Sequence, residues 1–180
     1  MTDTTPTPLP LPAATEDDHY GEIAVELLGE QREKLVVSGE RIPTITIVRA
    51  PEAEVDDHIV IGTRDPRHLT ITVDGEPATI KPAKGRLRRQ TYRVDVSCAG
   101  TRYRLVPDSI PGSRLTRDGK HLGDFSSDGD RRVIAEWRED AGTVEPLDAA
   151  IGYALSAAFG TGGQPMWMML VDAVSTALPG

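Results

Sequence analysis

The apolar stretch that opens at Pro146 constrains the fold of this chain more than any other feature. From Leu147 to Phe159, large apolar and alanine side chains recur at helical spacing, and a proline in the first turn suits a helix start. The opposite side is hardly more polar, because it holds Asp148, Gly152, Tyr153 and Ser156. A helix that is apolar on nearly every side must be covered on nearly every side. Its many small residues would let the covering walls approach closely.

The chain before this helix supplies strands as the covering walls. Short β-rich runs follow one another, several of them joined by Asp-Gly turns. We therefore predict a mainly β (α+β) fold, an antiparallel meander or barrel that encloses the apolar helix 146–159. The expected strands are residues 42–48, 58–63, 68–73, 78–81, 90–98, 101–106, 113–117, 121–125 and 132–137.

The clearest predicted hairpin turns at Ala99-Gly100. On its first strand Tyr92, Val94 and Val96 alternate with charged or polar residues, and the return strand continues the alternation. Such alternation gives a strand pair one apolar and one solvated face.

The two ends of the chain are predicted from composition and periodicity. Residues 1–18 are rich in Thr and Pro and then acidic, which predicts a disordered leader before a single β-rich domain over 19–180. Residues 21–34 fit both a helix and a strand, and we favour a helix. After glycines at 160–163, residues 165–178 predict a second short apolar helix.

The order of strands, Asp-Gly hairpins and apolar helix resembles the tubby-like fold, in particular its LURP-one-related branch. The resemblance covers roughly residues 90–160. It is carried by Tyr103-Arg104-Leu105, the run from Arg117 to Gly123, Ala135-Glu136-Trp137, and Leu147 to Ala150 with the helix that follows. It implies a barrel around a helix, and roles in scaffolding or in binding anionic phosphoinositide headgroups.

Charge and composition restrict the kinds of partner and the cellular location that we expect. The net charge of -8 makes nucleic acid an unlikely partner, and the single cysteine, Cys98, excludes an internal disulfide framework. The N-terminus lacks the pattern of a signal peptide, and no apolar stretch is long enough for a transmembrane segment, so we expect a cytoplasmic protein. Arg greatly outnumbers Lys, which suggests a bacterial source.

The best functional lead is a basic stretch that contrasts with the acidic total. Clustered guanidinium groups suit phosphate or carboxylate partners, such as an anionic ligand or a membrane surface. The alternatives are a solvated face, or pairing with the acidic loop from Glu52 to Asp57. The candidate residues are Lys81, Lys84, Arg86, Arg88, Arg89, Arg93, Arg102 and Arg104, with Asp95 among them.

Motifs for metal or nucleotide chemistry are weak. The run Asp124–Asp130 resembles the start of an EF-hand loop but lacks its final Glu, so we interpret it as a hairpin turn. Asp56-Asp57-His58 has no zinc-site spacing toward His68 or His121. The glycines at 160–163 lack the Lys-Ser/Thr of a phosphate-binding loop. We expect no metal, no cofactor and no enzymatic activity.

A second surface lies in the C-terminal apolar segment. Met166, Trp167, Met168, Met169 and Leu170 would form an adaptable apolar contact for a protein partner or a second copy, if they are not core. The sequence thus predicts a non-enzymatic binding or scaffold protein, with a structural or assembly role through this segment as the alternative.

Overall fold

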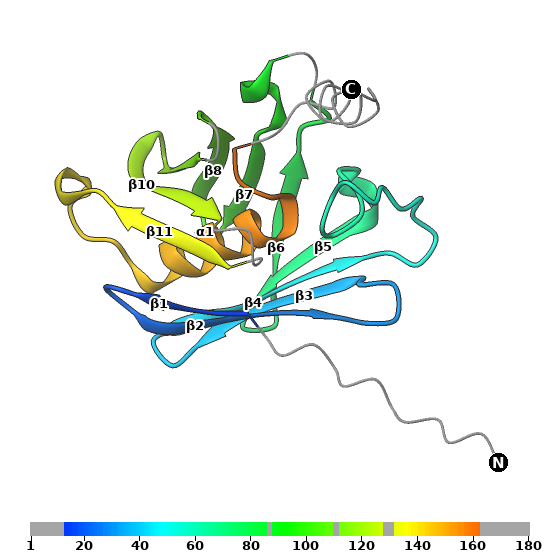
Figure 1. The fold of residues 1–180 in the computed structure, drawn as a ribbon, viewed down its shortest axis with the longest axis horizontal. Coiled ribbons are helices and arrows are strands. Elements are labelled where there is room, and N and C mark those ends of the chain that lie inside the picture. The colour runs from blue at the N-terminus through cyan, green and yellow to red at the C-terminus, as the bar shows by residue number, and fades with distance from the viewer. Residues whose placement is uncertain (1–12, 86–87, 110–111, 128–131, 163–180) are drawn as a thin grey trace, which may run out of the picture.

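A computed structural model describes residues 13–85, 88–109, 112–127 and 132–162. Over these residues eleven strands form one antiparallel sheet that curls into a nearly closed barrel around a C-terminal helix (Figure 1). Each strand pairs with the next one along the chain. The predicted fold class, an antiparallel barrel that encloses an apolar helix, is confirmed.

The strands divide the chain at short intervals. They are β1 (Ala13–Asp17), β2 (Gly21–Leu28), β3 (Lys34–Gly39), β4 (Ile42–Arg49), β5 (Leu69–Val73), β6 (Glu76–Pro82), β7 (Val94–Cys98), β8 (Thr101–Pro107), β9 (Ser113–Arg117), β10 (Lys120–Ser127) and β11 (Val133–Trp137). The helices are η1 (Pro66–His68), η2 (Arg89–Tyr92), η3 (Glu139–Ala141) and α1 (Pro146–Phe159).

Three two-residue turns set the register of the meander. Asp74-Gly75, Ala99-Gly100 and Asp118-Gly119 join β5 to β6, β7 to β8 and β9 to β10, and both residues of each turn have positive φ. Such turns match the twist of the strands that they connect. The fourth turn predicted from sequence, Asp128-Gly129, lies outside the described residues.

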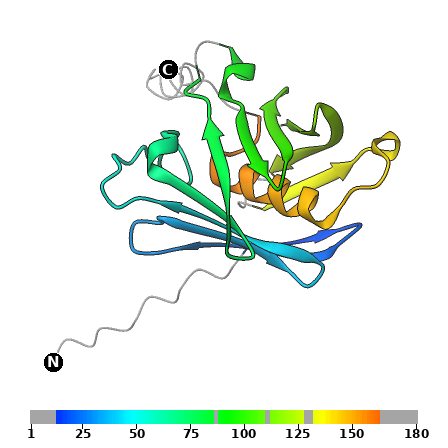
Figure 2. The same ribbon diagram turned by 180° about the vertical axis from the view of Figure 1, so that it is seen from behind.

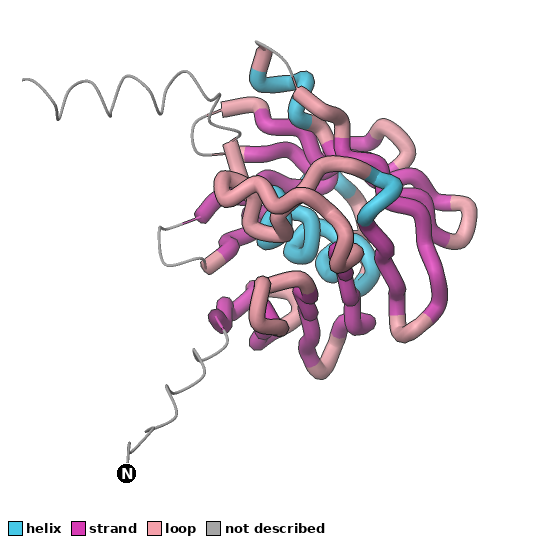
Figure 3. Tube along the Cα trace, turned by 90° about the vertical axis from the view of Figure 1, so that its right-hand side faces the viewer, coloured by secondary structure: helices cyan, strands magenta, loops and turns pink. Residues whose placement is uncertain are grey.

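Helix α1 fills the barrel. It lies inside the curled sheet (Figures 2 and 3). It contacts β3, β4 and β8 to β11, and every residue from Asp148 to Ser156 is buried. A Cβ on Gly152 would come within 2.2 Å of the Phe125 ring of β10, so a small residue is required there. The predicted close approach of small helix residues to the barrel wall is thereby observed.

The helix favoured for residues 21–34 is wrong. This segment forms β2, a turn, and the start of β3. Ile23, Val25 and Leu27 fit both periods, and pairing of β2 with β1 on one side and β3 on the other decides for the strand.

Three other boundaries differ from the sequence expectation. The disordered leader was expected to residue 18, but Ala13–Asp17 pairs with β2 as β1, and residues 1–12 lie outside the described part. The strand expected at 58–63 is a loop, because Ile59 and Gly62 hydrogen-bond within local turns. The start of the strand expected at 90–98 is instead η2.

The second predicted helix, residues 165–178, falls outside the described residues. In the part of the chain that the structure describes, no helix combines the length and apolar character that crossing a membrane requires.

Candidate functional site

The basic residues of β6 and β8, together with Arg93 just before β7, lie on the outer face of the barrel. Register places Lys81 beside Asp95, and Asp95 beside Arg104. Lys81, Arg93, Arg102 and Arg104 are exposed, whereas alternate residues such as Val94 and Tyr103 are buried inside. The apolar-in, charged-out alternation of the predicted hairpin is therefore observed over the two strands.

Asp95 neutralises part of this basic face. Its carboxylate accepts hydrogen bonds from Nε and Nη2 of Arg104 at 2.6 and 3.3 Å, and it lies 3.5 Å from Nε of Arg93. The hydrogen bond to Asp95 raises the pKa of Arg104. Asp108 similarly pairs with Arg114 of β9 at 3.3 Å. Arg93 and Arg104 are thus fixed in position by one shared carboxylate.

Four cations of the basic face have no carboxylate partner among the described residues. They are Lys81, Lys84, Arg88 and Arg102, and all four are exposed. Nε of Arg89 is buried and has no hydrogen-bond acceptor in this part of the chain. Arg86 lies outside the described residues. We define the basic face as Lys81, Lys84, Arg88, Arg89, Arg93, Arg102 and Arg104.

The acidic loop does not neutralise the basic face. Glu52 lies 3.9 Å from Nδ1 of His68, and no ion pair joins residues 52–57 to the basic face over the described ranges. The predicted alternative of pairing with this loop is therefore not observed, and Asp95 is the carboxylate that the basic residues share.

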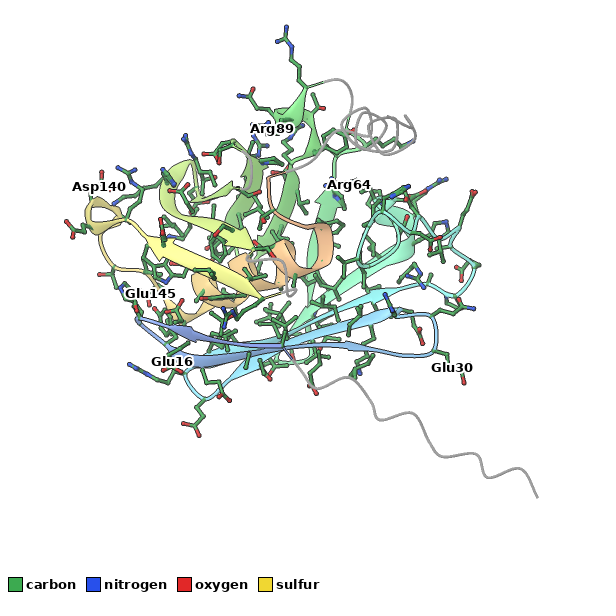
Figure 4. The ribbon with its side chains drawn as sticks, viewed as in Figure 1. Glu16, Glu30, Arg64, Arg89, Asp140 and Glu145 are labelled. Atoms are coloured by element: carbon green, nitrogen blue, oxygen red, sulfur yellow. The ribbon has the colours of Figure 1, made fainter. Side chains whose placement is uncertain are left out.

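Arg64 adds a cation that the sequence patterns did not reveal. Its guanidinium lies 5.3 Å from the ring centroids of both Tyr92 and Phe159, and Nη1 donates to the carbonyl of Ala83 at 2.9 Å. Burial lowers the pKa of Arg64 to about 10. Arg64 lies near the η2 end of the molecule, as does Arg89 (Figure 4). It joins η2 to the end of α1, where a cation is favourable.

A buried carboxylate on α1 fixes the helix to the barrel. Asp148 is fully buried and accepts hydrogen bonds from the Tyr103 hydroxyl at 2.8 Å and from Nη1 of Arg117 at 2.6 Å. It also accepts one from the backbone N–H of Glu145 at 2.7 Å. Burial and the bond to Asp148 raise the pKa of Tyr103. With three donors in place, this carboxylate serves the fold.

Asp17 has the same role at the seam between the first and last strands. Its carboxylate accepts hydrogen bonds from Nε1 of Trp137 at 3.0 Å and from the Tyr153 hydroxyl at 2.7 Å. The backbone N–H groups of His19 and Tyr20 donate to its other oxygen. Asp17 therefore links β1, β11 and α1 although β1 and β11 are not adjacent in the hydrogen-bonded strand order.

The histidines named with Asp56 and Asp57 do not gather. His58 lies in the loop between β4 and β5, His68 lies near Glu52, and Nε2 of His121 lies 3.0 Å from Asp124. No group of three or more metal-binding side chains occurs within the described residues. Asp124 belongs to β10, and the rest of the EF-hand-like run reaches residues outside the description.

The predicted protein-contact residues, Met166 to Leu170, lie outside the described residues. No family model, curated protein or solved structure matches this chain, so the arrangement of its own residues carries the functional argument.

Proposed function

We propose that this chain is a non-enzymatic binding or scaffold protein that contacts an anionic partner through the basic face. The observation that supports this most directly is the set of exposed cations without a carboxylate partner: Lys81, Lys84, Arg88 and Arg102. Lys81 and Arg102 project from β6 and β8, and Lys84 and Arg88 lie in the connection between β6 and η2. Exposed cations repel one another at close range, so an anion that binds between them relieves this repulsion.

The internal ion pairs support the same proposal. Asp95 restrains Arg93 and Arg104, so these side chains lose less freedom when a partner binds. Guanidinium groups held in this way can donate two parallel hydrogen bonds to a phosphate or carboxylate.

The overall charge favours a compact anionic partner. A net charge of -8 repels a long polyanion, whereas a single headgroup meets only the local positive field. The tubby-like resemblance implies a phosphoinositide headgroup, which belongs to this class, and it remains a prediction.

Binding to anionic vesicles tests the proposal. Phosphatidylcholine vesicles with and without a phosphoinositide are titrated with the wild-type chain and with the variant Lys81→Ala/Arg88→Ala/Arg102→Ala. Each basic residue near an anionic surface contributes about 1 kcal/mol, so the triple variant is expected to bind about a hundredfold more weakly. Binding is also expected to weaken as salt is raised.

A matched variant separates local from total charge. Lys34→Ala/Arg67→Ala/Arg138→Ala likewise removes one Lys and two Arg, from exposed positions outside the basic face. It is expected to retain wild-type binding. Equal weakening of the two variants would contradict a role for the basic face, as would salt-independent binding.

The alternative, assembly through residues 165–178, remains a prediction because this segment lies outside the described residues. A chain that ends at Gly162 tests it by size-exclusion chromatography and thermal melting. Loss of an oligomer with an unchanged melting temperature would support assembly, and a large fall in melting temperature would instead assign the segment to the core.

A further inference from the structure

A second candidate site lies away from the basic face, between two loops at one end of the barrel. It is a pocket of about 240 Å³ between the turn that follows β2 and the loop that joins β4 to β5. The β2–β3 turn carries Glu30, which Figure 4 labels at its tip. The volume suits a small organic group.

Arg49, at the end of β4, is the buried cation of this pocket. Its side chain lines the pocket, yet the residue is only 2% exposed. Nη1 donates to the carbonyl of Ile61 at 2.6 Å and Nη2 to the carbonyl of Gln31 at 2.7 Å. These two bonds join the loops on either side of the pocket and fix the guanidinium between them.

Gly62 makes room for this guanidinium. A Cβ at Gly62 would lie 2.2 Å from Nη1 of Arg49, and its φ of +89° is a conformation that favours glycine. The loop is closed by hydrogen bonds between Asp56 and Gly62 and between Gly62 and Ile59. The backbone of this loop, with glycine at position 62, therefore leaves the space that the Arg49 guanidinium occupies.

Arg49 forms no ion pair within the described residues, and its hydrogen-bond acceptors there are two carbonyl oxygens. Asp56 and Asp57 line the same pocket but do not pair with it. A guanidinium has five N–H donors, so two carbonyl oxygens leave further N–H groups for a ligand. A buried charge is costly unless it is paired, and a carboxylate is the partner that best fits the guanidinium geometry.

The rim of the same pocket is apolar and exposed. Val55 and Val60 line it and are 44% and 42% exposed, and Leu27 also lines it. Leu28, next to Leu27, is 40% exposed. Of the large hydrophobic residues that are exposed in the described part of the chain, Val55 and Val60 therefore line this pocket, whereas Leu28 does not. Two exposed valines at the rim of one pocket give it an apolar side that an aliphatic group can contact.

We propose that this pocket binds a carboxylate attached to a short aliphatic group, with the carboxylate on Arg49 and the aliphatic group against Val55 and Val60. Two sources carry this chemistry, a free aliphatic acid or amino acid and the C-terminus of a peptide that ends in an aliphatic residue. The proposal does not depend on the basic face, because none of the residues of that face lines this pocket.

The remaining charged groups of the lining restrict the ligand further. Asp56, Asp57 and His58 are exposed, and Oδ1 of Asp56 accepts the backbone N–H of His58 at 2.9 Å. Arg32, also exposed, lies on the opposite loop. Two carboxylates at the rim disfavour a ligand with more than one negative charge, so inorganic phosphate is expected to bind poorly.

Titrations of the full chain followed by amide NMR and calorimetry test the ligand chemistry. The probes are L-leucine, leucinamide, 4-methylpentanoate, inorganic phosphate, and a short peptide that ends in leucine with a free or an amidated C-terminus. We expect the amides of Ile59 and Gly62 to shift with carboxylate ligands. Removal of the carboxylate is expected to weaken binding about tenfold or more, as for a lost charge-assisted hydrogen bond.

Variants test the position of the site. Arg49→Met is expected to abolish binding, but it also removes two loop contacts and can unfold the loops. Val60→Glu and Val60→Gln keep Arg49 and differ only in charge at the exposed rim. We expect Val60→Glu to bind 4-methylpentanoate at least about tenfold more weakly than Val60→Gln. Arg138→Ala, an exposed site outside the pocket lining, is expected to bind as wild type.

Binding of the free acids alone identifies a small-molecule ligand, and binding of the peptide alone identifies a peptide terminus; either supports a carboxylate site. Equal affinity for leucine and leucinamide would overturn it, and so would tighter binding of phosphate, equal binding by the two Val60 variants, or no shift at Ile59 and Gly62 with any of the probes.

Discussion

Gly152 shows how a single residue determines the distance between α1 and the barrel wall. A Cβ at this position would lie 2.2 Å from the tip of the Phe125 ring, and Phe125 is itself fully buried between other rings. Gly152→Ala is therefore expected to lower the free energy of unfolding by about 1–3 kcal/mol, as overpacking does elsewhere. Urea denaturation measures this change.

A double mutant isolates the cause. Phe125→Leu shortens the neighbouring side chain, so the cost of Gly152→Ala is expected to be smaller in that background. An unchanged cost would show that the effect comes from helix backbone preferences and not from the ring.

Asp148 differs from Gly152 because one of its partners, Arg117, is charged. Asp148→Asn keeps the size of the side chain but leaves Arg117 without its buried anion. The new amide NH2 group is itself a donor, so it cannot accept from both the Tyr103 hydroxyl and Arg117. We expect a loss of about 3 kcal/mol in unfolding free energy. Asp95→Asn is the matched control, since the Asp95–Arg104 pair is solvent-exposed, and it is expected to cost about 1 kcal/mol or less. Similar losses at both sites would contradict the importance of burial.

At the scale of elements, local signals explain what the sequence predicted correctly. Helix α1 was predicted at its observed bounds because its start, its spacing and its stop are all encoded within residues 145–160. The hairpins at Ala99-Gly100 and Asp118-Gly119 follow from two-residue turns. The basic residues of the hairpin are close in sequence, so their shared face could also be predicted.

The features that the sequence did not reveal depend on distant partners. Residues 21–28 satisfy two periods, and only their pairing with β1 and β3 decides between them. The Arg64 guanidinium packs against the rings of Tyr92 and Phe159, which lie in different parts of the chain. Arg49 likewise donates hydrogen bonds to the carbonyl oxygens of Gln31 and Ile61, which lie on two different loops. Neither contact leaves a pattern in the local sequence.

The seam between β1 and β11 provides an element-scale prediction. Asp17 joins these strands through Nε1 of Trp137, while the Trp137 ring packs edge-on against Phe125. Trp137→Phe keeps an aromatic ring and removes the donor, so we expect a loss of about 1 kcal/mol and faster hydrogen exchange of the β1 amides.

The control for this seam variant is Tyr92→Phe, which removes a hydroxyl that forms no hydrogen bond with the described residues. Its β1 amides are expected to exchange as in wild type. Exchange that accelerates equally in β4 would show global destabilisation instead of a looser seam.

At the scale of the whole molecule, the interior of the barrel makes stability depend on alkaline pH. Burial is the main cause that raises the pKa of Tyr20, Tyr103 and Tyr153 above 10, and nearby carboxylates add to it. In the unfolded chain these tyrosines ionise near pH 10. Between pH 10 and their raised pKa values the folded state holds more protons, so its stability is fully present below pH 10 and is lost as pH rises.

Arg64 acts in the opposite direction. Burial lowers its pKa to about 10, so the folded state releases this proton while the unfolded chain keeps it, which favours the folded state above pH 10. One arginine opposes three tyrosines, two of which are hydrogen-bonded to buried carboxylates. The net expectation is alkaline unfolding that begins near pH 10.

Phenolate absorbance and circular dichroism, recorded together, measure this balance. Three of the four tyrosines are expected to ionise in one cooperative step that coincides with loss of β structure, because they ionise only when the barrel opens. In concentrated urea all four should titrate near pH 10 without a cooperative step. Gradual ionisation of all four tyrosines while the circular dichroism stays native would contradict the closed interior, because the phenol groups of Tyr103 and Tyr153 can reach water only if α1 leaves the barrel wall.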